Sequence, residues 1–279
     1  MKLLKKILLI GLISVLIAIG YTKYHNMNIN DVGLAVLGWV KKVKGDTVDI
    51  NNFNKEETPV LNHQDWNALL QKHVSETGQV SYKGFKEDSA NLQQYLDALS
   101  KNGPGSNWTE KQRLAYWINA YNAFTVKLII DNYPLKSIKD IGDGLPMIDS
   151  PWDIKFFKIG GVDFDLNTIE HVILRKQFKE PRIHFAVNCA SFSCPKLRNE
   201  AYFEDQLDAQ LTEQSKAFLN NVDKNKITES ETKLSKIFNW FASDFGGSKG
   251  VLKFIEKHKP AINKNNKVEY LEYGWTLNE

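Results

Sequence analysis

The 279-residue chain contains only two cysteines, Cys189 and Cys194, which excludes a disulfide-rich scaffold and a four-cysteine zinc site. Glycine and proline are also scarce, at 17 and 8 residues, too few for a fibrous or wholly disordered chain. What remains is an ordinary globular composition, 42% apolar and 25% charged, with seven tryptophans that can fill a large core. We therefore expect a folded domain with an additional segment at its N-terminus.

The chain also lacks a real excess of charge of one sign. Its formal net charge of +3 depends on Lys2, Lys5, Lys6 and Lys23, the only charged residues among the first 23. Without these four lysines, 32 basic residues stand against 33 acidic ones. A body this close to neutral gives no reason to expect nucleic acid as a partner.

The N-terminus has the pattern of a membrane anchor or a secretory signal. Its first three lysines precede an uncharged, almost wholly apolar run over 7–20. No polar stretch separates this run from Ala18 and Gly20, the small residues that would precede a cleavage site. For residues 1–23 we therefore favour an uncleaved signal anchor over a cleaved signal peptide. The lysines would stay in the cytoplasm, and the bulk of the chain, exported or anchored in the inner membrane, would lie in the periplasm or outside the cell.

The rest of the sequence predicts a linker over 24–61 and one α+β domain over 62–279, helix-rich with a small, mostly antiparallel sheet. Helical spacing and capping residues predict helices over 62–77, 89–99, 109–133, 167–178 and 202–220, and two short helices from residues 239 and 250. Alternation and turn residues predict an extended segment at 79–85, hairpins over 154–166 and 226–238, a buried strand over 182–188 and a closing strand over 268–275.

The predicted helix over 109–133 is unusually apolar and aromatic, which indicates the central buried helix. Thr109 and Gln112 form a capping box at its start. Asn119 and Asn122 stand out in it, because a buried amide without a partner costs about 1–3 kcal/mol. They bind a backbone loop in the simpler interpretation, or orient a catalytic histidine or a substrate carbonyl in the other.

One stretch of 24 residues concentrates His171, His184, Cys189 and Cys194. Cys189 directly follows a predicted strand, so its thiol can be exposed on a rigid support, and a nearby histidine would favour the nucleophilic thiolate. On a regular strand, His184 and Cys189 point to opposite faces. We therefore prefer His171, which follows Glu170 on the predicted helix, as the partner of the thiol.

Other interpretations of these residues stay open. Cys189 and Cys194 can form a structural disulfide outside the cytoplasm, which would abolish nucleophilic chemistry. Glu170 stands three residues after Asn167, where its carboxylate can simply cap a helix. A zinc site built from Glu170, the two histidines and the thiols lacks the usual helical ligand spacing, and a redox pair would be expected to have C-x-x-C spacing. We expect no cofactor.

Over about residues 62–279, the chain resembles the domain-of-unknown-function 547 family. The resemblance is carried by several long motifs in the family's order, which are HQDWNALLQKHVSETGQVSYKGF, WINAYNAFTVKLIIDNYP, DFDLNTIEHVILR, PRIHFAVNCASFSCPKL and YGWTLN. Bacterial members of this family are commonly exported, and eukaryotic relatives carry the domain beside other modules. The resemblance implies an exported bacterial protein from a family without an assigned function.

The family pattern includes a Glu-His dipeptide, matched by Glu170 and His171, a cysteine, matched by Cys189, and both asparagines of the long helix. Many relatives have another residue where this chain has Cys194. This implies a role of its own for Cys189 and makes a disulfide optional. The closing motif usually has Asp where this chain has Gly274, so the resemblance supports no acidic group there.

Together these observations predict a thiol-dependent hydrolase or acyltransferase of the cell envelope. Cys189 would be the nucleophile and His171 the general base, with Glu170, Asn119 or Asn122 orienting or lining the site. The substrate would be a peptide, an envelope polymer or an acyl ester. The alternative is a noncatalytic periplasmic or cell-surface binding or scaffold domain, in which the same residues hold the loop. An enzyme needs a free, accessible Cys189 within reach of a base, and a scaffold does not.

Overall fold

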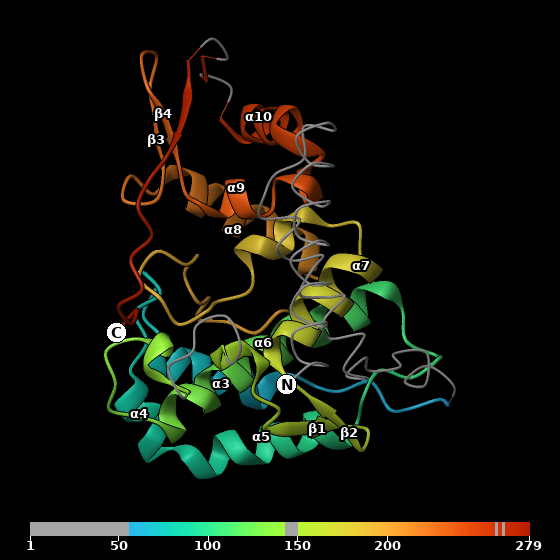
Figure 1. Cartoon of the computed structure of the whole chain (residues 1–279). Helices are drawn as coiled ribbons and strands as arrows, with labels where there is room; N and C mark the ends of the chain where they lie inside the picture. The colour runs from blue at the N-terminus through green and yellow to red at the C-terminus, as the bar shows by residue number, and fades with distance from the viewer. Residues whose placement is uncertain (1–55, 143–149, 260–261, 264–265) are drawn as a thin grey trace, which may run out of the picture.

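The computed structural model describes residues 56–142, 150–259, 262–263 and 266–279 (Figure 1). The predicted membrane segment, 1–23, and most of the predicted linker, 24–61, lie outside these ranges. Within the described ranges, no helix is both long and apolar enough to cross a bilayer. The α+β prediction is confirmed, since this part of the chain is rich in helices and has two small sheets.

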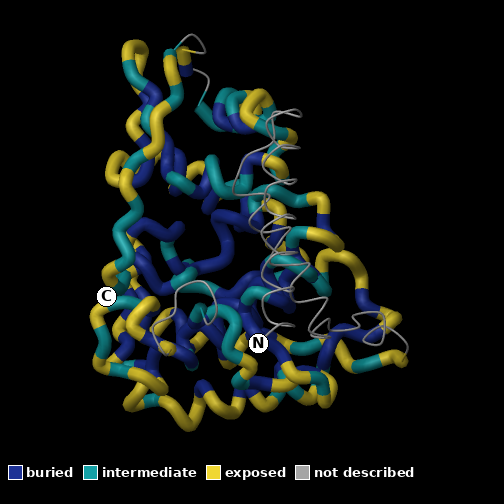
Figure 2. Tube along the Cα trace, viewed as in Figure 1, coloured by how far each residue is buried: buried dark blue, intermediate teal, exposed yellow. Residues whose placement is uncertain are grey.

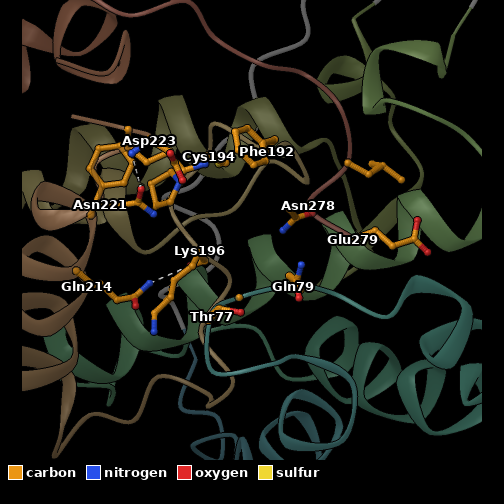
Figure 3. Close-up of a pocket in the computed structure, with 16 residues that line it drawn as sticks. Thr77, Gln79, Phe192, Cys194, Lys196, Gln214, Asn221, Asp223, Asn278 and Glu279 are labelled. Atoms are coloured by element: carbon orange, nitrogen blue, oxygen red, sulfur yellow. Dashed lines mark hydrogen bonds between the residues drawn. The ribbon is translucent and has the colours of Figure 1, made fainter. Parts of the chain in front are cut away.

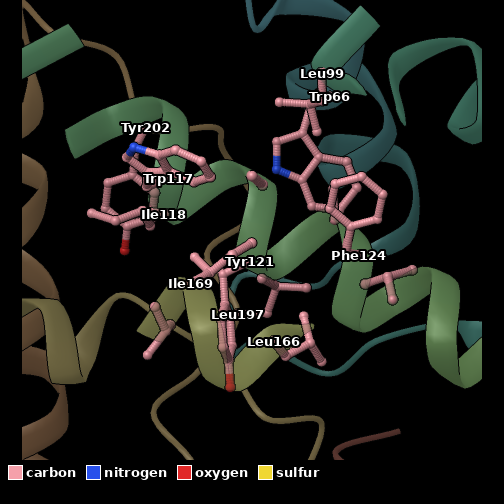
Figure 4. Packing of buried hydrophobic residues seen from close by; sticks show 14 of the residues in the cluster. Trp66, Leu99, Trp117, Ile118, Tyr121, Phe124, Leu166, Ile169, Leu197 and Tyr202 are labelled. Carbon is pink, nitrogen blue, oxygen red and sulfur yellow. The ribbon is translucent and has the colours of Figure 1, made fainter. Parts of the chain in front are cut away.

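The first part of the fold is built around α6 (Glu110–Asp131), which is buried along most of its length. It begins at the predicted capping box, in which Thr109 Oγ1 accepts from the Gln112 backbone and Gln112 Oε1 accepts from the Thr109 backbone. Large side chains from several elements gather around it (Figure 4). Fully burying each such side chain contributes about 1.5–3 kcal/mol, which is why this apolar stretch forms the interior. Helices α4 (Tyr82–Glu87) and α5 (Ser89–Lys101) contact α6, and α3 (Gln64–His73) lies against α5.

Two small sheets complete the fold. Strands β1 (Phe157–Ile159) and β2 (Val162–Phe164) form the first predicted hairpin, whose turn residues Gly160 and Gly161 both have positive φ, 57° and 82°. In the second sheet, β3 (Lys226–Ile227) pairs antiparallel with β4 (Thr232–Leu234), as predicted, and β5 (Val268–Tyr270) pairs parallel with β4. The sheets are therefore mostly antiparallel.

The second part of the fold has its own apolar cluster, centred on Phe185, Phe218 and Phe238. It lies above α6 in Figure 1 and is formed by the second sheet together with four helices, which are α8 (Leu207–Asn220), α9 (Ile237–Trp240), the 3-10 helix η6 (Ala242–Phe245) and α10 (Gly247–His258). Phe185 belongs to this cluster, whereas Ile183 and Ala186 belong to the cluster around α6. The segment around residue 185 therefore joins the two clusters, and Figure 2 shows buried chain continuing between them.

The prediction of an extended segment at 79–85 is wrong beyond its first residues. Val80 pairs with Val74, and the chain then turns into α4. Ser81 Oγ accepts a hydrogen bond from the Gly84 backbone at 3.2 Å and caps this helix. A serine N-cap here outweighs the local alternation of apolar residues.

The predicted strand over 182–188 is also wrong. Residues Pro181–Phe185 form a 3-10 helix, η5. Pro181 takes the first helical position, where a missing N–H costs nothing, and Glu180 Oε1 accepts from the Arg182 backbone at 3.1 Å. Residues 183–188 are all buried, and six buried residues in a row fit a short buried helical segment as well as a strand, so the alternation does not decide between them.

The predicted helix over 167–178 exists with a different start. A π-helix, η4 (Thr168–Leu174), continues into the short α7 (Arg175–Gln177). Asp165 Oδ1 accepts from the Thr168 backbone at 2.6 Å, so Asp165 and not Asn167 caps the helix. The side chain of Glu170 is thereby released from a capping role.

Candidate functional site

A cavity of about 200 Å³ lies between the two apolar clusters. Five polar side chains line it, which are Asn167, Glu170, His171, His184 and Cys189. The cavity also has an aromatic wall, whose rings come from Tyr121, Trp152, Trp240, Phe241, Tyr273 and Trp275. Apolar walls with a few converging polar groups are typical of small-molecule and active sites.

Cys189 is half-buried on a loop directly after η5, and the loop is fixed by Asn188. The Asn188 backbone donates to Asn122 Oδ1 at 2.8 Å, and its side chain donates to the Pro195 carbonyl at 2.7 Å. Asn188 Oδ1 in turn accepts from the Ala190 backbone at 2.9 Å. Ala190 has φ of +57°, an unfavourable conformation for a residue other than glycine, and such backbone strain clusters at functional sites.

Three groups surround the Cys189 thiol. Its Sγ lies 3.0 Å from Cys194 Sγ, 3.1 Å from Ser191 Oγ and 3.3 Å from Tyr273 Oη. The hydrogen bond from Cys194 lowers the pKa of Cys189 most, burial opposes it, and the bonds from Ser191 and Tyr273 lower it further. The resulting pKa is about 7, so near neutral pH about half of this thiol is thiolate.

Glu170 is a buried acid with a strongly shifted pKa. Burial raises the pKa of its carboxyl, Arg175 opposes this, and the charge of Cys189 raises it again. A hydrogen bond with the Tyr121 hydroxyl lowers it somewhat. The balance puts the pKa of Glu170 at about 7, where a carboxyl group can both donate and accept a proton.

His171 lies one residue along η4 and contacts Arg175, four residues further on. Arg175 Nη1 lies 3.2 Å from His171 Nδ1, and because guanidinium groups only donate, Nδ1 is the acceptor. The neutral ring then carries its proton on Nε2. In this tautomer His171 is a hydrogen-bond donor through Nε2 and has no lone pair there to act as a base.

The structure brings His184 to the cavity, which the predicted strand had excluded. Its Nε2 donates to Asp244 Oδ2 at 2.7 Å, its ring stacks on Phe241 with centroids 3.9 Å apart, and its Nδ1 is buried without a hydrogen-bond partner. Burial lowers the pKa of His184, although Asp244 opposes the shift. Arg175 also binds Asp244 through Nε and Nη2. Burial alone would raise the pKa of Asp244, but these bonds from His184 and Arg175 hold it well below its ordinary value.

The two helix asparagines bind backbone and do not line the cavity. Asn119 donates to the Tyr202 carbonyl at 2.8 Å and accepts from its backbone N–H at 3.0 Å. Asn122 donates to the Ala186 carbonyl at 3.0 Å and accepts from the Asn188 backbone. Asn122 therefore positions the Cys189 loop, whereas Asn119 holds a segment further along the chain.

None of the rings of the aromatic wall was predicted from the sequence as part of the site. The rings of Trp240, Tyr273 and Trp275 contact one another with centroids 4.6–6.1 Å apart, and Trp152 meets Trp275 edge-on at 5.7 Å. Tyr273 and Trp275 belong to the closing YGWTLN motif, and the two aromatic residues in this short motif are the sequence feature that could have pointed to them. Ser191 pairs with Leu277, which joins this closing segment to the Cys189 loop.

The two cysteines are free thiols in this structure. Within the described residues, no group of three or more His, Cys, Asp or Glu side chains is arranged to hold a metal ion. The cavity lining brings together a thiol and a carboxyl group whose pKa values both lie at about 7.

Residues 105–219 match a family model described as "Protein of unknown function, DUF547". The match contains all five polar residues of the cavity, whereas Trp240, Tyr273 and Trp275 lie outside it. No curated protein and no solved structure matches the chain. The resemblance inferred from the motifs is thus confirmed over residues 105–219, which match the DUF547 family model.

Proposed function

We propose that this protein is a thiol-dependent hydrolase or acyltransferase with Cys189 as its nucleophile. The observation that carries the proposal is the environment of the thiol, which has three hydrogen-bonding groups within 3.3 Å and borders a cavity. A thiolate stabilised in this way is a nucleophile near neutral pH without needing a separate base to ionise it.

The same geometry supports Glu170 as the general acid and base. In the first step, the Cys189 thiolate attacks a carbonyl carbon, and protonated Glu170 gives its proton to the leaving alcohol or amine, which leaves a thioester. In the second step, ionised Glu170 takes a proton from water, the hydroxide attacks the thioester, and the thiolate departs. A pKa of about 7 suits both transfers. In an acyltransferase, an acceptor hydroxyl or amine replaces the water.

We assign His171 a different role from the general base expected from the sequence. Its Nδ1 accepts from Arg175, so its Nε2–H is a donor suited to the developing oxyanion of the substrate. Asp244, bound by both Arg175 and His184, ties this helix to the second apolar cluster and keeps the tautomer in place.

We further propose that the protein acts in the cell envelope, tethered to the membrane or exported through residues 1–23, on a peptide, an envelope polymer or an acyl ester. The lysines followed by an uninterrupted apolar run support the location. The aromatic wall supports a substrate that presents a flat or apolar face beside its carbonyl group.

Trapping of the acyl-enzyme tests this function. The full-length chain, purified in detergent, is mixed with p-nitrophenyl acyl esters, quenched in acid and analysed by mass spectrometry. We expect one acyl group on Cys189, formed with saturation kinetics, and its accumulation in Glu170→Gln because deacylation slows. Cys189→Ser removes the adduct, and the surface variant Lys83→Ala is the matched control. Acylation of Cys189 no faster than that of the denatured chain would contradict the proposal.

The alternative of a noncatalytic binding domain is favoured by one observation, the cluster of Trp152, Trp240, Tyr273 and Trp275 at the cavity. Such a domain would bind envelope fragments equally well with Cys189→Ser, whereas Trp275→Ala would weaken binding. Binding without turnover, monitored by tryptophan fluorescence, would favour this alternative over the enzyme.

A further inference from the structure

Cys194 brings a second sulfur into contact with the proposed nucleophile. The two Sγ atoms lie 3.0 Å apart, and Cys194 Sγ also accepts a hydrogen bond from the Cys189 backbone at 3.0 Å. A disulfide bond is about 2.05 Å long, so the sulfurs stand about 1 Å outside bonding distance. The loop folds back and thus brings two thiols together that are five residues apart in the sequence, as the shorter C-x-x-C spacing does in redox motifs.

The backbone between the two thiols is held in place. Phe192 donates to the Thr276 carbonyl at 2.7 Å, and Ser193 donates to the Gly274 carbonyl at 3.1 Å. The Cys194 backbone donates back to the Ser191 carbonyl at 3.0 Å. Because these hydrogen bonds hold the backbone, rotation of the two cysteine side chains is sufficient to bring the sulfur atoms into bonding distance.

The two thiols differ in access. Cys189 is half-buried and borders the aromatic-walled cavity, whereas Cys194 is only 6% exposed. Cys194 lines a different cavity of about 250 Å³, together with Lys196, Gln214 and Asn278 (Figure 3). An oxidant that enters the aromatic-walled cavity therefore meets Cys189 first, with Cys194 held directly behind it.

We propose that Cys194 is a resolving thiol, and that the pair reduces hydroperoxides in an activity separate from acyl transfer. The Cys189 thiolate attacks the terminal oxygen of the hydroperoxide, the O–O bond breaks, and the departing alkoxide takes a proton from solvent water and leaves as the alcohol, so that Cys189 becomes a sulfenic acid. The Cys194 sulfur then attacks the sulfenic sulfur, the S–O bond breaks, and water leaves with the thiol proton. One peroxide thus accepts two electrons, and the two thiols become one disulfide.

This inference shares Cys189 with the proposed function but does not use Glu170. It gives the site a reversible off state, because a disulfide has no thiolate to attack a carbonyl. It also protects the nucleophile, since capture by Cys194 precedes irreversible oxidation to the sulfinic acid. A small dithiol reverses the state by thiol–disulfide exchange.

The test uses the full-length, reduced chain in detergent with one equivalent of cumene hydroperoxide, with dimedone present to trap sulfenic acid. For the wild-type chain we expect two thiols lost per peroxide, a disulfide between Cys189 and Cys194 within one chain, and recovery with dithiothreitol. Cys194→Ser is expected to lose one thiol per peroxide and to form about tenfold more dimedone adduct at Cys189. Near-ultraviolet circular dichroism checks the fold, and Lys83→Ala is the matched control.

The wild-type stoichiometry decides the question even if Cys194→Ser fails to fold. One thiol lost per peroxide, with Cys194 still open to alkylation after denaturation, would overturn the inference, and so would disulfides formed only between chains. Glu170→Gln separates the two proposals, because it is expected to impair acyl transfer while two thiols are still lost per peroxide and the disulfide still forms. A Cys189 that reacts with esters and forms no disulfide contradicts the resolving role alone, whereas a Cys189 inert to both reagents contradicts both proposals.

Discussion

Tyr273→Phe removes one hydroxyl group from the surroundings of Cys189 and little else. The ring stays to contact Trp240 and Trp275, whose centroids lie 4.8 and 4.6 Å away. The lost hydroxyl lies 3.3 Å from Cys189 Sγ and 3.1 Å from Ser191 Oγ. The variant therefore removes one hydrogen bond that favours the thiolate, together with the hydrogen bond that Ser191 Oγ donates to the same hydroxyl.

The size of the effect follows from that bond. A hydrogen bond to a charged group contributes about 1.5–3 kcal/mol, and this one is long, so about 1.4 kcal/mol is a fair value. That energy is one pKa unit and moves the pKa of Cys189 from about 7 toward about 8. The thiolate fraction at pH 6 falls about tenfold, but the more basic thiolate is about threefold more nucleophilic. Alkylation is therefore about threefold slower at pH 6, about threefold faster at pH 9.5, and equal near pH 7.5.

The assay is the rate of Cys189 alkylation by iodoacetamide across pH, read by mass spectrometry of the peptide. Tyr270→Phe is the matched control, since Tyr270 lies on the same closing segment and is exposed. Its profile is expected to overlay the wild-type profile. Coincident profiles for wild type and Tyr273→Phe, or a uniform slowing at every pH, would refute the role of this hydroxyl.

Three further predictions concern stability measured by urea denaturation. Asn122→Ala leaves the buried Ala186 carbonyl and Asn188 N–H without partners, and the free energy of unfolding is expected to fall by about 2–5 kcal/mol; a change below 1 kcal/mol would contradict this. Glu170→Gln is expected to stabilise the chain by about 3 kcal/mol at pH 8 and not at pH 4, because burial raises this pKa from 4.5 to about 7 and ionisation above pH 4.5 opposes folding. Burial lowers the pKa of His63 from 6.5 to about 4, so between pH 6.5 and pH 4 the stability of the wild-type chain relative to His63→Gln is expected to fall by about 3 kcal/mol, and a difference that stays constant over this range would refute this origin.

Local rules predicted those parts of the fold that depend on few residues. The capping box at Thr109 and the paired glycines at 160 and 161 act through their own backbone, so the sequence is sufficient to place α6 and the first hairpin. The prediction of a strand over 182–188 was wrong because the alternation of this segment is compatible with both a strand and a buried helical turn. Pro181 and the capping side chain of Glu180 decide between them in favour of the helical turn.

The candidate site could be predicted only in part. Glu170, His171 and Cys189 were found because they lie close together in the sequence, and the structure places all three at one cavity. The groups that set their protonation lie far away in the sequence, at Tyr273 and Asp244, and no local pattern points from one to the other. Asn122 was recognised as a buried amide needing a partner, but its partner, the Asn188 backbone, is visible only after folding.

The closing segment has a consequence for timing. Tyr273 follows Cys189 by 84 residues, and Asn278 accepts a hydrogen bond from Tyr82, 196 residues earlier. The ribosome therefore releases Cys189 well before Tyr273, whose hydroxyl group lowers the pKa of the Cys189 thiol. Until the closing segment docks, that hydroxyl is absent, and a thiol with a pKa of about 8 is only about one-tenth ionised at neutral pH. Long-range contacts of this kind form late. The thiolate fraction of Cys189 at neutral pH is therefore lower in the nascent chain than in the folded protein.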